Sequence, residues 1–383
     1  MGSINRGTLP QNFLDSVSSG ITLATPEPQY FFARMAQGNR ALAQALNAGM
    51  QTAQQFGSIA GGGTIQDPAL DSMLRAADAY PMAVMAMDVF GKNKGDTIKF
   101  DRDILEGGGY DEASRLLGQD ATISTTGQVI NNEETVAILR QYVGPYSSSA
   151  SAVRPYAIDE FSAHYRANKV QLASKVTRHL RHDYTKWLDR VIRAQFLRST
   201  NITYPNGISA ATDFAAGVGA GVTLEQMLKA KEALSRREWK KFGNGKYMCL
   251  VPPSFTTQMS QDPDFRQLSA NHQADKNPLY GYIGSVQDMD FFECTTLAQY
   301  SDNGGDDIAT LNGGTIAAGT VVEEALIFGP ETVGFGTADS PECRWADDTN
   351  YGTVAKVIWY AMHAFQTLDT RGIQRVPYQG TDA

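Results

Sequence analysis

Three side chains at helical spacing are the best candidates for metal chemistry in this chain. His179, His182 and Asp183 lie close together, and histidines three residues apart share one face of an α-helix. Imidazole nitrogens and carboxylates are ligands that zinc accepts. The two histidines would need further ligands, however, and no third ligand is apparent. A solvated or subunit-contacting helix face explains the pattern, so we predict no metal site.

Three other patterns could carry chemistry, and each lacks a required part. Residues 302–307 (DNGGDD) resemble part of a calcium loop but lack its spacing and closing glutamate, which favours a surface turn. Residues 217–221 (GVGAG) lack the Gly-Lys-Ser/Thr sequence and the preceding strand of a phosphate-binding loop, which favours a flexible loop. Asp288 and Asp290 could form an acid/base pair, but no nucleophile or oxyanion donor accompanies them. We therefore predict no catalytic residue and no cofactor.

The composition is that of a soluble globular protein. The 383 residues are 42% hydrophobic and 19% charged, enough for two or three cores. A formal charge of -8 disfavours a surface made to grip phosphates, so tight nucleic-acid binding is not expected. No window reaches ~18 consecutive apolar residues, so we expect no membrane contact. The cysteines Cys249, Cys294 and Cys343 are scattered among apolar neighbours, which predicts buried free thiols in a reducing compartment.

The longest element is predicted between Pro155 and Pro205, where the sequence contains neither glycine nor proline. A helix from about Glu160 to Arg198 would be roughly 55 to 60 Å long, and we call it the spine. Its apolar residues recur at steps of three, four or seven and share one face, namely Phe161, Tyr165, Leu172, Val176, Leu180, Tyr184, Trp187, Val191 and Ala194. The other faces carry Arg166, Lys169, Lys175, Arg178, Lys186, Arg190 and Arg193.

Two segments before the spine are predicted to need a neighbour. Residues 1–66 form an arm with few apolar residues, helical from about Tyr30 to Phe56, which we expect partner subunits to hold in place. After a helix at 67–79 and a strand near Val89 and Phe90, residues 97–145 predict a two-stranded excursion. Residues 97–100 alternate as in a half-exposed strand, and further strands are expected at 122–130 and 135–143. We find no continuous apolar face, so this ribbon alone would be marginally stable.

The chain after the spine predicts an α+β region. Thr223 and Gln226 form a capping box for a helix to about Arg237. Residues 247–251 predict a buried strand stopped by two prolines, followed by a helix to about Leu268. Strand residues recur from Ile283 to Cys294. The final strands, at residues 325–328 and 354–365, are apolar on both sides, as expected for a sheet against the spine.

Several local patterns, in their order along the chain, resemble the major capsid proteins of tailed phages, which have the Hong Kong ninety-seven fold, and most closely the N-four-type coat family. The segments are residues 95–100 (GDTIKF), 131–134 (NNEE), 155–159 (PYAID), 250–253 (LVPP), 277–285 (NPLYGYIGS), 289–294 (MDFFEC) and 345–352 (WADDTNYG). Each is short, and their collinear order carries the match. The first 66 residues do not follow the family pattern.

The resemblance implies an α+β capsid subunit with an arm, an extended β-loop that reaches over a neighbour, a peripheral domain that contains the spine, and an axial domain near the capsomer centre. We place these parts at residues 1–66 (arm), 67–96 (peripheral domain), 97–145 (extended loop), 146–205 (peripheral domain with the spine), 206–325 (axial domain) and 326–383 (return strands of the peripheral domain and C-terminal tail).

The function implied by the resemblance is that of a major capsid protein, not an enzyme. Such subunits form hexamers and pentamers of an icosahedral shell that encloses double-stranded DNA without sequence-specific binding. Portal and scaffolding proteins are the implied partners, with decoration proteins as further candidates. We expect a virion protein assembled in the host bacterial cytoplasm. Two alternatives stay open: a bacterial nanocompartment shell of the same fold, and a carboxylate-dependent hydrolase, which would need a pocket with perturbed titrating groups.

Overall fold

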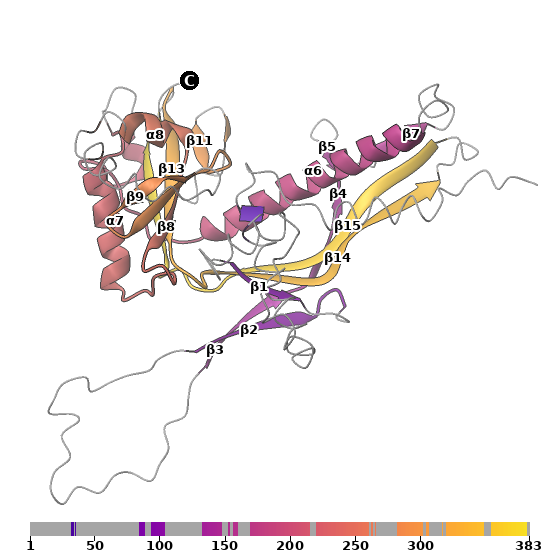
Figure 1. The fold of residues 1–383 in the computed structure, drawn as a ribbon, viewed down its shortest axis with the longest axis horizontal. Helices are drawn as coiled ribbons and strands as arrows, with labels where there is room; N and C mark the ends of the chain where they lie inside the picture. Colours follow the sequence, from indigo (N-terminus) through magenta and orange to yellow (C-terminus); the bar gives the residue numbers. More distant parts are fainter. Residues whose placement is uncertain are drawn as a thin grey trace, which may run out of the picture.

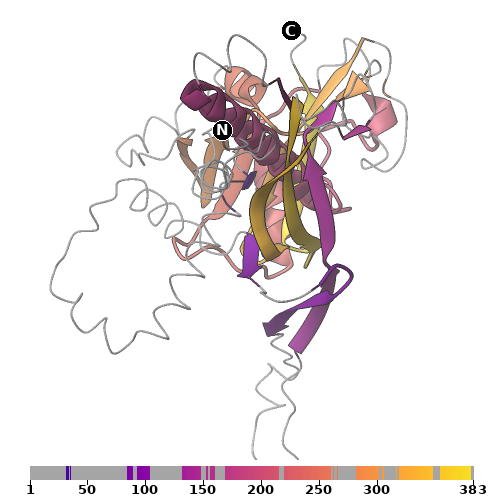
Figure 2. The same cartoon turned by 90° about the vertical axis from the view of Figure 1, so that its right-hand side faces the viewer.

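The computed structural model describes a mixed α+β fold built on one long helix and two main sheets (Figures 1 and 2). Among the residues that the structure describes, no helix is long and apolar enough to cross a membrane. The expected helices at 30–56 and 67–79 and the expected strand at 122–130 lie outside it, apart from three residues. The described residues are 32, 33, 35, 84–88, 93–103, 132–147, 152–153, 156–159, 169–214, 220–259, 262, 265, 282–301, 304–305, 316, 319–347 and 354–380.

The spine is present as α6 (Lys169–Phe196), a helix of 28 residues and about 42 Å. The prediction is confirmed over this length. Residues 160–168 lie outside the described part, and the helix ends just before Arg198. Its buried apolar side chains are Val176, Leu180, Tyr184, Leu188, Ile192 and Phe196. Ala194, expected on the apolar face, is exposed, because the Leu188, Ile192 and Phe196 side of the last turns is the side that packs.

Five strands form the sheet that α6 packs against, in the order β1-β14-β15-β4, with β7 also paired to β15. Their bounds are β1 (Val84–Asp88), β4 (Arg140–Gly144), β7 (Tyr156–Asp159), β14 (Val333–Asp347) and β15 (Val354–Thr367). Figure 1 shows α6 running along the long antiparallel strands β14 and β15. The ring of Trp187 on α6 lies 5.1 Å from that of Trp359 on β15. The prediction that a C-terminal strand lies against the spine is therefore confirmed.

Two strands of this sheet differ from the sequence prediction. The strand expected near Val89 and Phe90 is described at Val84–Asp88, and residues 89–92 lie outside the described part. No sequence pattern indicated β14, because Gly334, Gly336 and Pro341 interrupt its alternation and its pairing with β15 shifts register between residues 337 and 342.

The second sheet has the order β12-β11-β13-β8-β10-β9. A seventh strand, β16, lies off this path and also pairs with β13. The predicted strand at Tyr247–Val251 is confirmed as β8, all five of whose residues are buried. The remaining strands are β9 (Tyr282–Val286), β10 (Met289–Glu293), β11 (Gln299–Ser301), β12 (Gly304–Gly305), β13 (Val321–Phe328) and β16 (Ile373–Gln379). Figure 1 places this sheet at the C-terminal end of α6.

Three helical segments accompany the second sheet: η3 (Ala211–Asp213), α7 (Leu224–Arg236) and α8 (Pro253–Met259). Thr223 caps α7 as predicted, because its Oγ1 accepts from the Gln226 amide at 3.3 Å. The reciprocal half of the capping box is wrong. Gln226 instead donates its Nε2 to the Thr203 and Pro377 carbonyls. Of the helix expected to reach Leu268, α8 ends at Met259, Asp262 is not helical and Phe265 is helical.

The excursion begins as a two-stranded ribbon, β2 (Thr97–Asp103) paired with β3 (Asn132–Ile138). Residues 104–131 lie outside the described part, and a small hairpin, β5 (Tyr146–Ser147) with β6 (Ala152–Val153), follows β4. The expectation that the ribbon has no continuous apolar face is wrong. Ile98, Phe100, Ala137 and Leu139 are buried in one cluster with Ala338, Met362 and Ala364 of β14 and β15. The base of the ribbon is therefore stabilised by its own chain.

Two short crossings join the two sheets, at residues 329–332 and 368–372. The crossings lie side by side, because the Gly329 amide donates to the Gly372 carbonyl at 3.1 Å. A Cβ on either glycine would lie within 2.4 Å of the Trp239 indole, which packs against both crossings. The expected boundary between residues 325 and 326 falls inside β13, and β16 pairs with β13 rather than with the spine sheet.

Candidate functional site

The structure does not assemble the histidine pattern into a metal site. His179 and His182 are exposed on α6, whereas Asp183 turns toward the sheet and accepts a hydrogen bond from Trp359 Nε1 at 2.6 Å. Burial raises the pKa of Asp183, and the Trp359 hydrogen bond partly offsets this. Within the described residues no group of three or more His, Cys, Asp or Glu side chains could hold a metal ion.

Asp288 and Asp290 do not form an acid/base pair, because lysines engage both. Asp288 lies in the β9–β10 turn with its carboxylate 2.9 Å from Lys241 Nζ, and the hydrogen bond from Lys241 lowers the pKa of Asp288. Asp290 lies 3.2 Å from Lys246 Nζ. Each carboxylate is therefore engaged in an ion pair with a lysine, and within the described residues neither faces a nucleophile that it could activate.

The remaining sequence candidates show no reactive arrangement in the described residues. Of residues 302–307 only Gly304 and Gly305 are described, as β12, and residues 217–219 lie outside the described part. The three cysteines are buried and free, as predicted. Burial raises the pKa of Cys294 to about 11 and that of Cys343 to about 12, and raises the pKa of Cys249 well above its usual value. These thiols are not nucleophilic thiolates at neutral pH.

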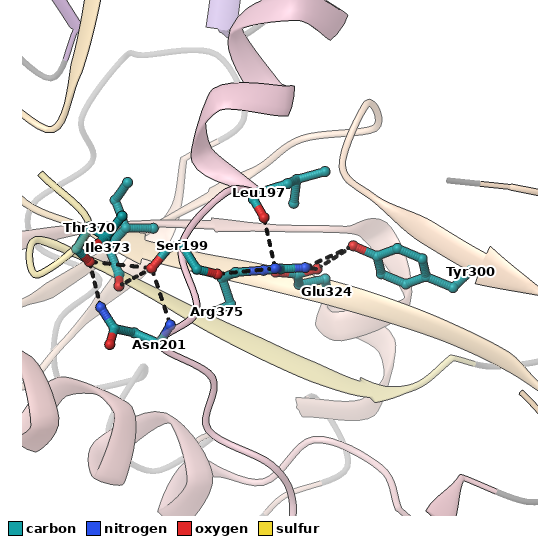
Figure 3. Close-up of polar contacts among 8 residues, drawn as sticks. All are labelled: Leu197, Ser199, Asn201, Tyr300, Glu324, Thr370, Ile373 and Arg375. Atoms are coloured by element: carbon teal, nitrogen blue, oxygen red, sulfur yellow. Dashed lines mark hydrogen bonds and ion pairs between the residues drawn. The ribbon is translucent and has the colours of Figure 1, made fainter. Parts of the chain in front are cut away.

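The densest polar arrangement is a buried ion pair that the sequence did not single out. Arg375 of β16 and Glu324 of β13 have no exposed side-chain surface, and Figure 3 draws their contacts. Arg375 donates to both carboxylate oxygens, with Nη2 2.9 Å from Oε2. Tyr300 of β11 donates its hydroxyl to Glu324 Oε2 at 2.7 Å and accepts from Arg375 Nη2 at 3.1 Å. Glu324 holds the pKa of Arg375 above its usual value against the opposing effect of burial.

Arg375 also connects the sheet to the end of the spine. Its Nη1 donates to the carbonyls of Leu197 and Ser199, at 2.8 and 3.2 Å, just after α6 ends. Beside it, Ser199 Oγ donates to the Ile373 carbonyl at 3.2 Å and Asn201 Nδ2 to the Thr370 carbonyl at 2.5 Å (Figure 3). These bonds satisfy carbonyls of the turn after α6 and of the segment that leads into β16. The arrangement is a structural joint, and its two charged side chains have no exposed surface.

A small part of the N-terminal arm packs on the same subunit. Phe32 is fully buried, with its ring 5.4 Å from that of Phe196. Asp189 of α6 accepts a hydrogen bond from the Ala33 amide at 3.2 Å, and burial raises the pKa of Asp189. Partner subunits were expected to hold residues 1–66 in place. The described residues of the arm instead contact the spine of their own subunit.

The ribbon presents apolar side chains on its second face. Val136 and Ile138 of β3 are 45% and 51% exposed, and Val143 of β4 is 40% exposed. They alternate with the buried Ala137 and Leu139, because successive strand residues point to opposite faces. Apolar side chains grouped on an exposed strand face are typical of a contact with another chain. Alternation of residues 135–143 was the only sequence signal for this surface.

The sequence model for phage capsid proteins matches residues 166–376. This span is more than half of the chain and includes α6, both crossings between the sheets and the Arg375–Glu324 pair. The chain belongs to the phage capsid protein family. No curated protein matches this capsid protein.

Solved capsid structures share the fold. The capsid protein of Ralstonia phage GP4 is 12% identical, with a TM-score of 0.51 over 78% of this chain and 88% of that one. That of cyanophage Pam1 is also 12% identical, with a TM-score of 0.51 over 79% and 90%. That of cyanophage P-SCSP1u is 13% identical, with a TM-score of 0.50 over 78% and 86%. The predicted α+β capsid fold is confirmed, and this capsid protein is a structural subunit of a viral shell.

Proposed function

We propose that this phage capsid protein is the major subunit of a tailed-phage head, that it assembles as hexamers and pentamers, and that the shell encloses double-stranded DNA. Portal and scaffolding proteins complete the head, and assembly takes place in the host bacterial cytoplasm. The protein has no catalytic role in this proposal. Support comes from the family match and from a fold whose polar clusters in the described residues serve packing rather than chemistry.

The two sheets define the working parts of the subunit. We assign α6 and the sheet of β14 and β15 to the peripheral domain, and the second sheet with α7 and α8 to the axial domain. The boundaries then fall at the crossings, residues 329–332 and 368–372, so that β16 belongs to the axial domain. Residues 97–145 are the extended loop and residues 1–66 the arm, as the resemblance implied.

The observation that carries the proposal is the two-faced ribbon. Its buried face docks on β14 and β15, so the subunit fixes the direction in which the ribbon leaves the body (Figure 2). Its other face carries Val136 and Ile138 into solvent. A two-stranded ribbon whose base is packed on the subunit and whose outer face is apolar is suited to contact an adjacent copy of the same chain.

The test is to express the full chain and examine the product by electron microscopy and sedimentation. We expect closed icosahedral particles, formed by the chain alone or with its scaffolding protein. Heads purified from infected cells should contain DNA and one tail vertex. Particles that enclose a protein cargo and never DNA would favour the nanocompartment alternative. No observation favours the hydrolase, since Asp288 and Asp290 each form an ion pair with a lysine.

A further inference from the structure

The outward face of α6 carries a row of cations. Lys175, Arg178, Lys186 and Arg190 are all exposed. At 100° per residue they fall within an arc of about 120°, a third of the helix circumference. His179 and His182 lie in the same arc. We call the four Lys and Arg residues the basic stripe. From Lys175 to Arg190 it is about 22 Å long, at 1.5 Å per residue.

No carboxylate forms an ion pair with the basic stripe in the described part of the chain. Of the two acidic residues of α6, Asp183 accepts a hydrogen bond from Trp359, although the charge of Lys186 also acts on it, and Asp189 is buried against Ala33. None of the four cations forms an ion pair with a described residue. Exposed cations of the axial domain are paired by contrast, and their pairs are Lys229–Glu225, Arg236–Glu232, Lys240–Glu331 and Lys241–Asp288.

We propose that the basic stripe binds the phosphate backbone of double-stranded DNA without regard to base sequence. The proposal rests on the proposed function only in taking that DNA to be the enclosed genome. A duplex carries one charge per about 1.7 Å, so a parallel duplex presents about 13 phosphates along the stripe. Neighbouring cations of the stripe lie within roughly one or two Debye lengths, so they attract a linear polyanion together.

The chemistry of the face favours DNA over an acidic protein. Protein interfaces are anchored by buried apolar or aromatic side chains. The exposed large hydrophobic residues of the described chain are Val136, Ile138 and Val143, and none lies on α6. A row of cations without an apolar anchor matches a regularly charged rod. Because the whole subunit carries -8, such contacts are weak and salt-dependent, which agrees with the expectation that the protein does not bind nucleic acid tightly.

The experiment measures DNA binding by the full-length protein as a function of salt. The probe is a labelled random-sequence duplex of about 30 base pairs, and its anisotropy is recorded from about 50 to about 200 mM salt. The stripe variant is Lys175→Gln, Arg178→Gln, Lys186→Gln and Arg190→Gln. The control, Lys229→Gln, Arg236→Gln, Lys240→Gln and Lys241→Gln, loses the same charge from paired positions.

We expect the stripe variant to reduce the slope of log K against log salt by about 3 to 4, at about 0.9 per phosphate contact. In the wild type, the contacts of the stripe should therefore lower the affinity for DNA roughly 100-fold when the salt concentration rises fourfold. The control should change the slope by less than about 1. Equal slopes for the two variants would overturn the proposal.

Two further measurements cover a different partner and an unfolded variant. If poly-glutamate binds as well as DNA and loses binding in the same variant, the partner is an acidic protein and the DNA assignment is wrong. If the fourfold variant is unfolded by circular dichroism, Lys186→Gln with Arg190→Gln should still reduce the slope by about 1.8. Electron microscopy of the wild-type protein distinguishes this proposal from the proposed function. If normal shells form but the protein shows no affinity for DNA, the capsid function stands and DNA binding by the basic stripe is rejected.

Discussion

Arg375 of β16 and Glu324 of β13 form an ion pair across two neighbouring strands, and neither side chain has any exposed surface. Arg375 simultaneously binds the carbonyls of Leu197 and Ser199, so one guanidinium joins the end of the spine to the second sheet. Hydrogen bonds fill the remaining positions of both charged groups, which is the condition under which a buried pair offsets its desolvation.

Breaking this pair from one side should strongly destabilise the subunit. Arg375→Met or Glu324→Leu is expected to lower the free energy of unfolding by about 3 to 5 kcal/mol, because the remaining partner stays buried without its hydrogen bonds. The double variant Glu324→Leu with Arg375→Met should recover much of this loss. Urea unfolding of unassembled protein measures all three. Arg236→Met, whose partner Glu232 is exposed, serves as control and should cost less than about 1 kcal/mol. Additive effects in the double variant would contradict the coupling.

Asp189 should make the stability of the subunit depend on pH in mild acid. Burial raises its pKa, so the folded state favours the protonated carboxyl. Its stabilising contribution is therefore present at pH below about 4 and declines as the pH rises through the folded pKa, by about 1.4 kcal/mol for each unit of the shift. Asp189→Asn lacks this titration. Unfolding midpoints of the two proteins, compared from about pH 4 to about pH 7, should converge or cross as pH rises. A constant difference would show that the pKa of Asp189 is unchanged on folding.

The ribbon base should respond to steric changes at Gly336. A Cβ at this position would lie 2.3 Å from Ile98 Cδ1, so Gly336→Ala overpacks the contact between β14 and β2. We expect a loss of about 1 to 3 kcal/mol. Ile98→Val removes Cδ1, and the next atom, Ile98 Cγ1, is 3.6 Å away. The double variant should therefore be more stable than the sum of the single changes implies. Strict additivity in thermal unfolding would mean that β2 does not pack there.

The outer face of the ribbon should matter for assembly and not for folding. Val136→Lys with Ile138→Lys places charges at exposed positions, so circular dichroism and the unfolding midpoint should stay close to those of the parent. Particle formation should fail, because an apolar contact with the next subunit is replaced by desolvated charge. Ser235→Lys with Gln287→Lys adds the same charge at exposed axial positions and should assemble. Normal shells from the ribbon variant would remove this face from the subunit contact.

Local sequence signals determined much of this protein. The 3.6-residue period of α6 from Val176 to Tyr184, the Thr223 cap and the apolar run of β8 were readable, because helix faces, caps and buried strands depend on residues within a few positions of one another. The ordered series of short segments from residues 95 to 352 also indicated the capsid family before any contact was known. Composition and the lack of a complete catalytic motif pointed the same way.

Tertiary structure decided the joints. Arg375 lies 51 residues from Glu324 and 178 from Leu197, and no local pattern indicates which groups a lone charged strand residue will meet. The docking of Ile98 at Gly336, the side-by-side crossings at Gly329 and Gly372, and the membership of β16 in the second sheet likewise depend on pairings between distant segments. Such contacts form only after the chain has closed long loops. They therefore cannot be predicted from a short stretch of sequence and are seen only in the packed structure.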